Sequence, residues 1–483
     1  MCTFTLVSST INEIEPFYQL HGADGALAED SLALDYRAST SIIATITALR
    51  KRHYVVWFSG AISLITLPLA PLASETVFVG FVGDCSVHTH KRNCFPVLSV
   101  YPVAARLVQG ILAVIAIMAA ALAIAINRRK TGVYANPLSI AGLATLFQDN
   151  YMIEDFRRLN AYLPTSKAIR DSFQGNRYAI DTYVEADGSM AYGITITHHN
   201  TLPIGPGQTV SRLDGNNYAS VALNTVDGSA PATKPSSSPW VHPATVMVFA
   251  VFVCGLEVLV LYYGHTGGDT GFERFMDSAQ FGVSFLFTAV GVSFKMYWSL
   301  LDDEIRSMEP YRQLLHGEAK AADSVLLAPH SNPFTGVFHS LAHKHFFNAY
   351  ISSVAILCEP LIVSLASIPF QHGEAWETYI VSNWLVVAIL SMMLIGITWF
   401  LCRKKTPGLI RRPDTVASIM LYLCGSHMLK DFKGMARLKQ KRRDELVEEW
   451  DKRYSMGRFI GMDAVEREGI DESCFVGDGD GRG

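Results

Sequence analysis

Six stretches of this sequence are long and apolar enough to cross a lipid bilayer as helices. They are residues 54–73, 103–126, 243–263, 281–300, 346–369 and 381–402. About 20 apolar residues cover the hydrocarbon core, where backbone amides and carbonyls need partners within the segment itself. The sequence therefore predicts an all-α membrane protein, a bundle of six transmembrane helices with a small cytoplasmic insert. The charged fraction of 17% agrees, because soluble proteins average about 25%.

Basic residues border these stretches unequally. If the N-terminus is cytoplasmic, the outer loops contain only Lys91, Arg92 and Arg274. The clusters 50–52, 128–130 and 403–405 then lie at the cytoplasmic ends of spans. Because cytoplasmic flanks of membrane helices are enriched in Lys and Arg, we expect both termini in the cytoplasm.

Two parts of the chain carry the same motifs in the same order. Glu15-Pro16-Phe17, Asp30-Ser31-Leu32, Arg52-His53-Tyr54 and Pro68 correspond to Glu309-Pro310-Tyr311, Asp323-Ser324-Val325, Lys344-His345-Phe346 and Pro360. The paired spans run in the same direction, which predicts an internal parallel repeat about an axis along the membrane normal. We expect Glu-Pro to set a turn, Asp-Ser to cap a helix, and each proline to bend its span.

The repeat also defines the domains. We predict a first membrane module at 1–160, a cytoplasmic insert and linker at 161–242, a second membrane module at 243–433 and a cytoplasmic tail at 434–483. Two spans precede the second module's motifs and none precedes the first, although Phe4 to Phe17 resembles Tyr297 to Tyr311. We therefore expect the first module to lack preceding helices, either because the gene model is incomplete or because they were lost.

The segments between and after the spans carry their own patterns. Residues 137–159 and 413–435 each predict an amphipathic helix, and 439–453 a solvated one with paired charges. Residues 178–197 predict a hairpin around Asp187-Gly188. We expect a linker at 200–238, which is rich in Pro, Gly, Ser and Asn, and a frayed acidic end at 466–483.

Cysteine placement points to one disulfide. Of eight cysteines, only Cys85 and Cys94 fall on the outer side in this orientation, where conditions are oxidising. We expect them to pair with each other. His88 and His90 lie between them, so a zinc or copper site is the alternative, although the second module lacks this pattern.

Two carboxylates, Glu257 and Glu359, lie inside predicted spans. Ionisable groups in a bilayer are costly and therefore mark candidate functional positions. At 1.5 Å per residue, both lie about 20 Å from the cytoplasmic end of their spans, so they could share a layer. A proton or cation relay would need such a layer, but we expect instead that each carboxyl is neutral and hydrogen-bonded to a neighbouring helix. Lys295 lies near a cytoplasmic end, where its side chain can reach the headgroups.

The duplicated Glu-Pro-aromatic and Asp-Ser-aliphatic motifs, with the basic Arg128 to Thr131 and Arg403 to Thr406 segments, resemble a family of filamentous-fungal multi-pass membrane proteins. That family is built from repeats of a domain of unknown function. The resemblance covers residues 13–156 and 281–433. It implies a fungal integral membrane protein at the plasma membrane, and it implies no catalytic or binding residue.

These patterns favour a non-enzymatic membrane protein that is structural or binds a cytoplasmic protein partner. A transporter or channel that uses Glu257 and Glu359 is the alternative. The sequence has no phosphate-binding loop, His-Glu-x-x-His motif, nucleophile elbow or EF-hand loop, so we expect no catalytic residue, cofactor or metal. The net charge of −4 gives no reason to expect a nucleic-acid partner.

Overall fold

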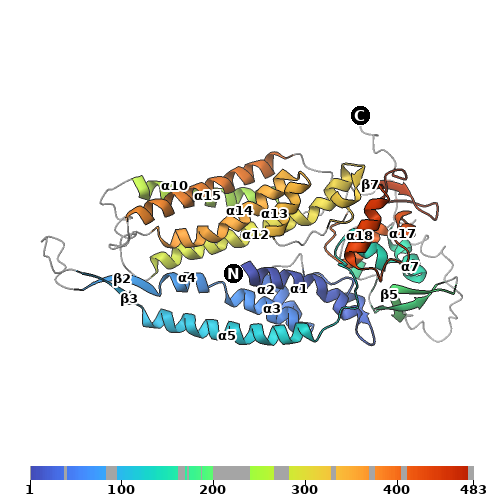
Figure 1. The fold of residues 1–483 in the computed structure, drawn as a ribbon, viewed down its shortest axis with the longest axis horizontal. Helices are drawn as coiled ribbons and strands as arrows, with labels where there is room; N and C mark the ends of the chain where they lie inside the picture. Colours follow the sequence, from blue (N-terminus) through green and yellow to red (C-terminus); the bar gives the residue numbers. More distant parts are fainter. Residues whose placement is uncertain are drawn as a thin grey trace, which may run out of the picture.

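The computed structural model shows a long bundle of apolar helices with two small β-sheets at one end (Figure 1). It describes residues 2–36, 41–82, 95–160, 169–170, 173, 175–185, 188–198, 240–265, 282–327, 333–368, 376–403, 409 and 411–476. Helix makes up 64% of the structure. We call the described chain up to His198 the first half, and the described chain from Trp240 onward the second half.

Six helical segments in the described chain are long and apolar enough to cross a membrane. They are Tyr54–Ser74, Pro102–Asn127, Pro243–His265, Val283–Leu315, Phe346–Ala366 and Tyr379–Cys402. The predicted spans are confirmed to within a few residues, except that the fourth is much longer than 281–300. The sequence prediction ended it early because charges begin at Asp302, but the helix continues beyond the apolar part into the two-sheet end.

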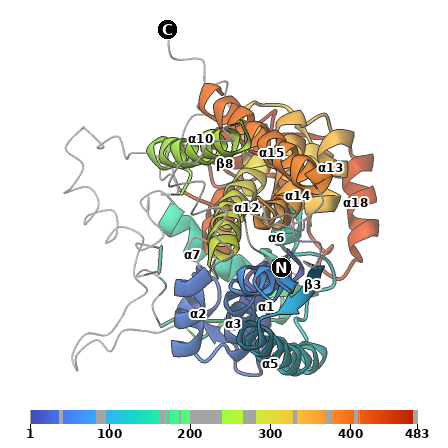
Figure 2. The ribbon, with the colours of Figure 1, turned by 90° about the vertical axis from the view of Figure 1, so that its left-hand side faces the viewer.

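The first half contributes the helices α1 (Cys2–Leu20), α2 (Ser41–Arg50), α3 (Tyr54–Ile65), α4 (Leu69–Ser74) and α5 (Pro102–Asn127). The second half contributes α10 (Pro243–His265), α12 (Val283–Leu315), α13 (Pro333–Ala342), α14 (Phe346–Ala366) and α15 (Trp376–Cys402). Figure 2, seen along the bundle, places α1, α2, α3 and α5 on one side and α10, α12, α13, α14 and α15 on the other. Each half therefore keeps its long helices together.

The halves meet through a carboxylate at the end of the bundle opposite the two sheets. Glu75, just after α4, is buried and accepts hydrogen bonds from the backbone N–H of Gly282 at 3.1 Å and of Phe285 at 2.7 Å. Both donors belong to the first turn of α12, where backbone amides lack helical acceptors and the helix dipole favours a negative charge. A hairpin of β2 (Val77–Val82) and β3 (Phe95–Val100) follows at this end. The sequence analysis had not predicted these strands, so the protein is not purely α-helical.

The other end of the bundle carries two three-stranded antiparallel sheets of matching order. One is formed by β1 (Ala26–Leu27), β4 (Arg177–Val184) and β5 (Met190–His198); the other is formed by β6 (Ala319–Lys320), β7 (Arg453–Ile460) and β8 (Glu466–Glu472). The predicted hairpin at 178–197 is confirmed as β4 and β5. Short helices accompany the sheets: α6 (Ile140–Leu146), α7 (Asn150–Asn160), α16 (Val416–Leu423), α17 (Met428–Asp431) and α18 (Gln440–Glu449). We call these sheets and helices the two-sheet unit.

The halves are joined in this unit by reciprocal hydrogen bonds. The N–H of Ala141, in the first turn of α6, donates to the carbonyl of Val325 at 2.9 Å, and the N–H of Ala417, in the first turn of α16, donates to Leu32 at 2.9 Å. Leu32 and Val325 end the two Asp-Ser motifs. Each half therefore supplies an acceptor for a helix start of the other half.

A second reciprocal pair lies further along the same helices. The amide Nε2 of Gln148 donates to the carbonyl of Leu429 at 3.0 Å, and the thiol of Cys424 donates to the carbonyl of Ile153 at 3.6 Å. Gln148 and Cys424 occupy corresponding positions after α6 and α16, and Ile153 and Leu429 occupy corresponding positions in α7 and α17. The exchange of contacts between halves thus extends over two helix pairs.

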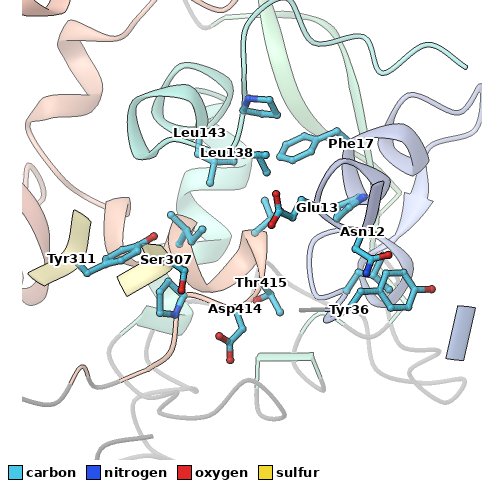
Figure 3. Close-up of a pocket in the computed structure, with 16 residues that line it drawn as sticks. Asn12, Glu13, Phe17, Tyr36, Leu138, Leu143, Ser307, Tyr311, Asp414 and Thr415 are labelled. Atoms are coloured by element: carbon cyan, nitrogen blue, oxygen red, sulfur yellow. The ribbon is translucent and has the colours of Figure 1, made fainter. Parts of the chain in front are cut away.

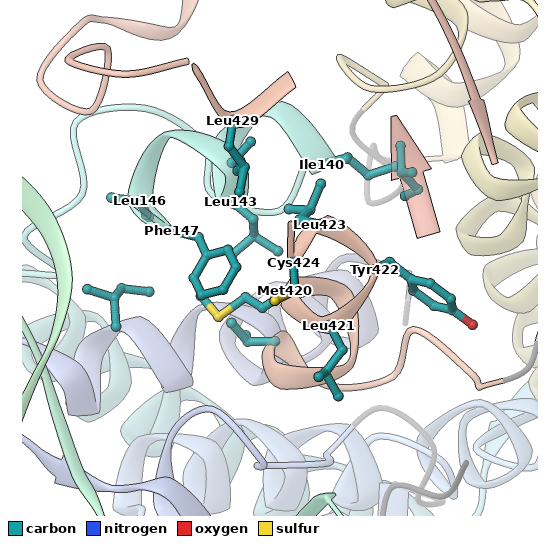
Figure 4. Packing of buried hydrophobic residues seen from close by; sticks show 14 of the residues in the cluster. Ile140, Leu143, Leu146, Phe147, Met420, Leu421, Tyr422, Leu423, Cys424 and Leu429 are labelled. Atoms are coloured by element: carbon teal, nitrogen blue, oxygen red, sulfur yellow. The ribbon is translucent and has the colours of Figure 1, made fainter. Parts of the chain in front are cut away.

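One hydrophobic core fills the two-sheet unit, and both halves contribute to it; we call it the shared core. Its aromatic and aliphatic members include Phe17, Phe147, Phe156, Tyr178, Ile194, Tyr311, Tyr422, Phe432, Tyr454 and Ile470. Figure 4 shows side chains of α6 and α16 packed against each other within it. Burial of each such side chain contributes about 1.5–3 kcal/mol, so neither half keeps its full core without the other.

Two predictions about the soluble segments are wrong in part. Residues 137–159 do not form one helix, because α6 ends at Leu146 and α7 begins at Asn150. Between them the carboxylate of Asp149 accepts the N–H of Tyr151 at 3.1 Å, and this local side-chain acceptor starts a new helix. Residues 413–435 are likewise divided into α16 and α17.

The predicted frayed end at 466–483 is also wrong over its first part. Residues Glu466–Glu472 form β8, paired along its length with β7. Ile470 and Asp471 are fully buried there. Its charged and glycine-containing sequence does not favour a strand, so residues Glu466–Glu472 adopt this conformation because they pack against the shared core. The predicted linker 200–238 and the end of the tail beyond Val476 lie outside the described residues.

The motif residues follow our predictions only in part. Pro16 and Pro310 lie inside α1 and α12, so the Glu-Pro pairs set no turn. Asp-Ser does not cap an α-helix either, since Asp30 and Asp323 end short 3-10 helices. Pro68 separates α3 from α4, whereas α14 continues through Pro360.

Candidate functional site

Glu359 is paired with a cation inside the membrane-spanning bundle. Its carboxylate contacts the ammonium Nζ of Lys295, which comes from α12 and whose side chain is 10% exposed. The sequence analysis found both charges but did not pair them. Their positions on two spans of the same half were the available signal, and helix packing between α12 and α14 brings them together.

Glu257 has a different partner. Its carboxylate accepts the hydroxyl of Ser391, on α15, at 2.5 Å. The structure records no hydrogen bond or ion pair between Glu257 and Glu359 among the residues it describes. Glu359 therefore has its partner on α12 and Glu257 has its partner on α15. Among the described residues, no recorded contact connects the two carboxylates, as a relay would require.

The other predicted site residues, Cys85 and Cys94, lie outside the described residues, as do His88 and His90. Elsewhere in the described chain, no group of three or more His, Cys, Asp or Glu side chains is arranged to hold a metal ion.

The recurring motif residues form matching contacts in the two halves. Asp30 pairs with Lys51 at 2.9 Å, and Asp323 pairs with the corresponding residue, His343, at 2.5 Å. Glu15 and Glu309 each accept a hydrogen bond from the glutamine one turn later, Gln19 or Gln313. The Asp30 and Asp323 contacts tie the loops that carry Leu32 and Val325 to the turn before the next span, whereas the two Glu–Gln contacts lie within α1 and α12.

The acidic residues that follow the apolar part of α12, Asp302 to Glu304, lie inside this helix. Asp302 accepts the hydroxyl of Ser352 at 2.6 Å and pairs with Arg306 at 2.9 Å. Glu304 receives two hydrogen bonds from Arg412, at 2.7 and 2.8 Å. Arg312, further along α12, pairs with Glu309.

A cavity of about 60 Å³ lies where the two halves meet beside the shared core (Figure 3). Corresponding residues of the two halves line it: Glu13 and Ser307, Phe17 and Tyr311, Pro137 and Pro413, Leu138 and Asp414, and Leu143 and Ile419. Substrate pockets usually measure about 300–1,000 Å³, and one water occupies about 30 Å³ in the liquid. The cavity therefore accommodates water or a small ion and is too small for an organic substrate.

A buried histidine joins the first Asp-Ser loop to the start of α3. The ring Nδ1 of His53 lies 2.6 Å from the hydroxyl of Tyr36, and both side chains are buried. Burial lowers the pKa of His53, against the opposing effect of Glu15 and Asp30. Burial also raises the pKa of Tyr36, so the phenol stays neutral and keeps its proton in the hydrogen bond with the imidazole.

This contact predicts a loss of stability in acid. Unfolded His53 has a pKa near 6.5 and the folded value is lower, so the unfolded state binds more protons as the pH falls through 6.5. The contribution is present above that pH and declines below it. We expect the thermal midpoint in detergent to fall between pH 7.5 and 5.5 more steeply for wild type than for His53→Asn. Parallel pH profiles of the two proteins would contradict this assignment.

Asp471 places a buried carboxylate at the start of α17. It is 0% exposed and accepts hydrogen bonds from the hydroxyl of Ser426 at 2.9 Å, the N–H of His427 at 3.0 Å and the N–H of Met428 at 3.1 Å. In the second half the capping carboxylate thus comes from a strand, whereas in the first half it comes from the residue just before the helix. There Asp149 caps α7 and accepts the hydroxyl of Thr195, which occupies the strand position corresponding to Asp471, at 2.7 Å.

Asp471→Asn should therefore destabilise the two-sheet unit by about 2–3 kcal/mol, because the amide group offers a donor where several donors need an acceptor. The matched control is Thr195→Val, which removes one hydroxyl and should cost about 1 kcal/mol. Urea unfolding of the detergent-solubilised protein measures both. Equal losses from the two substitutions would show that Asp471 is not a central acceptor.

The sequence model of a family described as a protein of unknown function (DUF3433) matches residues 2–78 and 281–370. The first region contains α1 to α4 and the second contains α12 to α14. The two matched regions are consistent with a duplicated domain. No curated protein and no solved structure matches the chain.

Proposed function

We propose that this chain is a multi-pass integral membrane protein with a structural or interaction-mediating role and no enzymatic activity. The observation that carries the proposal is the reciprocal docking of α6 on Val325 and of α16 on Leu32. The recurring motifs are used to join the halves and to hold the loops at their junction. The two-sheet unit is then a single rigid surface available to a protein partner.

We further propose that the halves are copies of one module, related by an axis along the membrane normal, with the two-sheet unit and both termini in the cytoplasm. The matching sheet orders, the two regions matched by the family and the basic clusters at the span ends support this arrangement. The resemblance to filamentous-fungal membrane proteins supports a plasma-membrane location.

The orientation is tested with protease-sensitive reporters in intact cells. One reporter is inserted beside Cys85 and the other follows the tail beyond Val476. We expect external protease to cut the first and to spare the second. Cleavage of both, or of neither, would overturn the arrangement.

The interaction role is tested on the full-length chain. A photo-crosslinker is placed at exposed Tyr151, on α7 of the two-sheet unit, and at exposed Val103, at the other end of the bundle. After irradiation in native membranes, a specific protein adduct is expected at Tyr151 and not at Val103. Repeated failure to recover a reproducible adduct at exposed positions of the two-sheet unit would count against a binding role.

A transporter or channel is the second candidate, and the ionisable groups in the spans favour it. Lys295, Glu359 and Glu257 lie within membrane-spanning helices, where such groups often mark ion pathways. The test is proton- or cation-dependent uptake into reconstituted vesicles. Uptake by wild type that is lost in Glu257→Gln/Glu359→Gln would favour transport. Uptake kept by the double variant would exclude these carboxylates as the relay.

A further inference from the structure

Two short helices, α2 and α13, occupy corresponding places before α3 and α14. The turns that join each pair have the same backbone. Arg52 and Lys344 have positive φ angles of 60° and 61°, and the next residue donates its N–H back to the short helix, His53 to Ala48 at 2.9 Å and His345 to Ser340 at 2.7 Å. Both halves therefore build the same helical hairpin.

In the first half, the short helix runs back alongside the span that follows it. A Cβ atom on Gly60 would lie 2.1 Å from the hydroxyl oxygen of Thr45, so the two helices are in close contact there. Gly60 is six residues beyond Tyr54, the first residue of α3, which corresponds to about 9 Å along the span. Figure 1 draws α2 beside α3, and α13 beside α14, away from the two-sheet unit. If α3 and α14 cross a membrane, α2 and α13 lie at membrane depth.

The side chains of both helices are arranged in the opposite sense to a helix on a water-soluble protein. Small residues face the protein: Ala44 and Ala48 in α2, and Gly336 and Ser340 in α13, are buried. Large apolar residues face outward at corresponding positions: Ile42, Ile46 and Leu49 in α2, and Phe334, Phe338 and Leu341 in α13. Phe338 is 75% exposed and Ile46 is 49% exposed.

Small residues toward the protein and large apolar residues outward are the arrangement expected of a helix in contact with lipid, and it is unfavourable for a helix in contact with water. Membrane helices approach each other through small residues four apart, and they direct large apolar side chains to the acyl chains. In water the same surface would be an exposed apolar patch repeated in both halves. The first residues of the following spans, Tyr54 and Phe346, are exposed aromatic residues as well.

The basic residues at the turns between α2 and α3 and between α13 and α14 also fit a lipid environment. Arg50, Arg52 and Lys344 are exposed beside the first residues of α3 and α14. Basic residues at this level lie among lipid headgroups and are attracted by anionic ones. The apolar face and its basic border thus match the acyl region and the headgroup region of one leaflet.

We propose that α2 and α13 are re-entrant helices that lie in the leaflet on the side of the two-sheet unit, with their outward faces against acyl chains. The proposal rests on the membrane insertion proposed above and adds a second class of membrane segment to it. Neither helix crosses the bilayer. Each half therefore has one short lipid-facing helix beside a span, α2 beside α3 and α13 beside α14.

The test uses the wild-type full chain in phosphatidylcholine vesicles with phosphatidylserine and a trace of phospholipid that carries a diazirine on its acyl chain. After irradiation, adducts are mapped by peptide mass spectrometry. Exposed Ile117, within α5, reports insertion, and exposed Tyr151, on α7, reports the aqueous phase. Adduct yields on α2 and on α13 are expected within about twofold of that at Ile117 and about tenfold or more above that at Tyr151.

Hydroxyl-radical oxidation of the same vesicles gives the complementary measurement, since Ile46 and Phe338 should be protected while Tyr151 is oxidised. Lipid adducts at Ile117 without adducts on either short helix, or on only one of them, would overturn the proposal while leaving membrane insertion intact. Oxidation of Ile46 and Phe338 to the extent seen at Tyr151 would also overturn it. Absence of adducts at Ile117 itself would defeat the insertion on which the proposal rests.

Discussion

Lys295→Met should destabilise the helix bundle by about 1–3 kcal/mol, because it leaves the Glu359 carboxylate without its cation, while the 38% exposure of the Glu359 side chain limits the loss. Methionine keeps much of the volume of lysine, so the loss comes mainly from the charge. The partner substitution Glu359→Gln should also be harmful, and the double variant Lys295→Met/Glu359→Gln should recover most of the stability. The measurement is the midpoint and free energy of unfolding in bicelles.

The matched control is Glu257→Gln. Among the described residues Glu257 has a hydroxyl partner and no cation partner, and glutamine retains an oxygen that accepts the hydroxyl of Ser391. A change of about 1 kcal/mol or less is expected there. If Lys295→Met were no worse than Glu257→Gln, or if the double variant were no better than the single ones, the ion pair would not be a stabilising contact of the folded bundle.

The same cycle bears on function. A structural pair is replaceable by a neutral pair, since only the balance of charge matters to the fold. A transport relay needs the titratable carboxylate itself, so it fails in every variant that lacks Glu359. Recovery of stability in the double variant together with unchanged behaviour in cells therefore supports the structural role, and recovery of stability with lost uptake supports transport.

Apolar spans were predictable because a single physical requirement, a length of apolar residues sufficient to cross hydrocarbon, fixes them. The helix of the predicted span 281–300 extends beyond it, continuing as α12 to Leu315. Its later turns are charged, and hydropathy does not detect a helix that leaves the membrane. Their stability comes from contacts distant in sequence, such as Ser352 with Asp302 and Arg412 with Glu304.

The two-sheet unit was predicted only in part, because its strands depend on partners far along the chain. The hairpin of β4 and β5 has the alternating, β-branched sequence that local patterns detect. The strand β8, which corresponds to β5, lacks such a sequence. The internal repeat nevertheless indicated it. Arg177-Tyr178 and Arg453-Tyr454, and Gly193-Ile194 and Gly469-Ile470, are separated by the same number of residues as Ser139 and Thr415. Extending the repeat beyond residue 433 would have predicted the second sheet from the first.

The candidate site shows a similar limit. Glu257 and Glu359 were predicted as ionisable groups in spans, but their partners follow from how α10, α12, α14 and α15 pack, and sequence spacing does not encode that packing. Lys295 was expected to extend toward the headgroups, whereas it reaches Glu359 on α14. The cavity between the halves likewise depends on the way Glu13 and Asp414 are brought together from opposite halves, which no local pattern indicates.

Phe432→Ala should loosen the first half as well as the second, because both halves share one core. Phe432 is fully buried and packs edge-on against Trp450, with ring centroids 5.6 Å apart. Its removal should cost about 3–5 kcal/mol, as for other large-to-small core substitutions. The informative measurement is amide hydrogen exchange, followed separately in β4 and β5 and in β7 and β8.

If the two-sheet unit unfolds as one body, protection falls by a similar factor in both sheets, since the same opening reaction exposes them. The equivalent substitution in the first half, Phe156→Ala in α7, should give the same pattern. Tyr151→Ala, on the exposed face of α7, controls for helix propensity and should change stability by about 0.5 kcal/mol or less. Loss of protection confined to the half that carries the substitution would mean that the halves are independent domains that merely touch. The reciprocal hydrogen bonds of Ala141 and Ala417 would then be contacts of docking, and the role proposed for the recurring motifs in uniting the halves would fail with them.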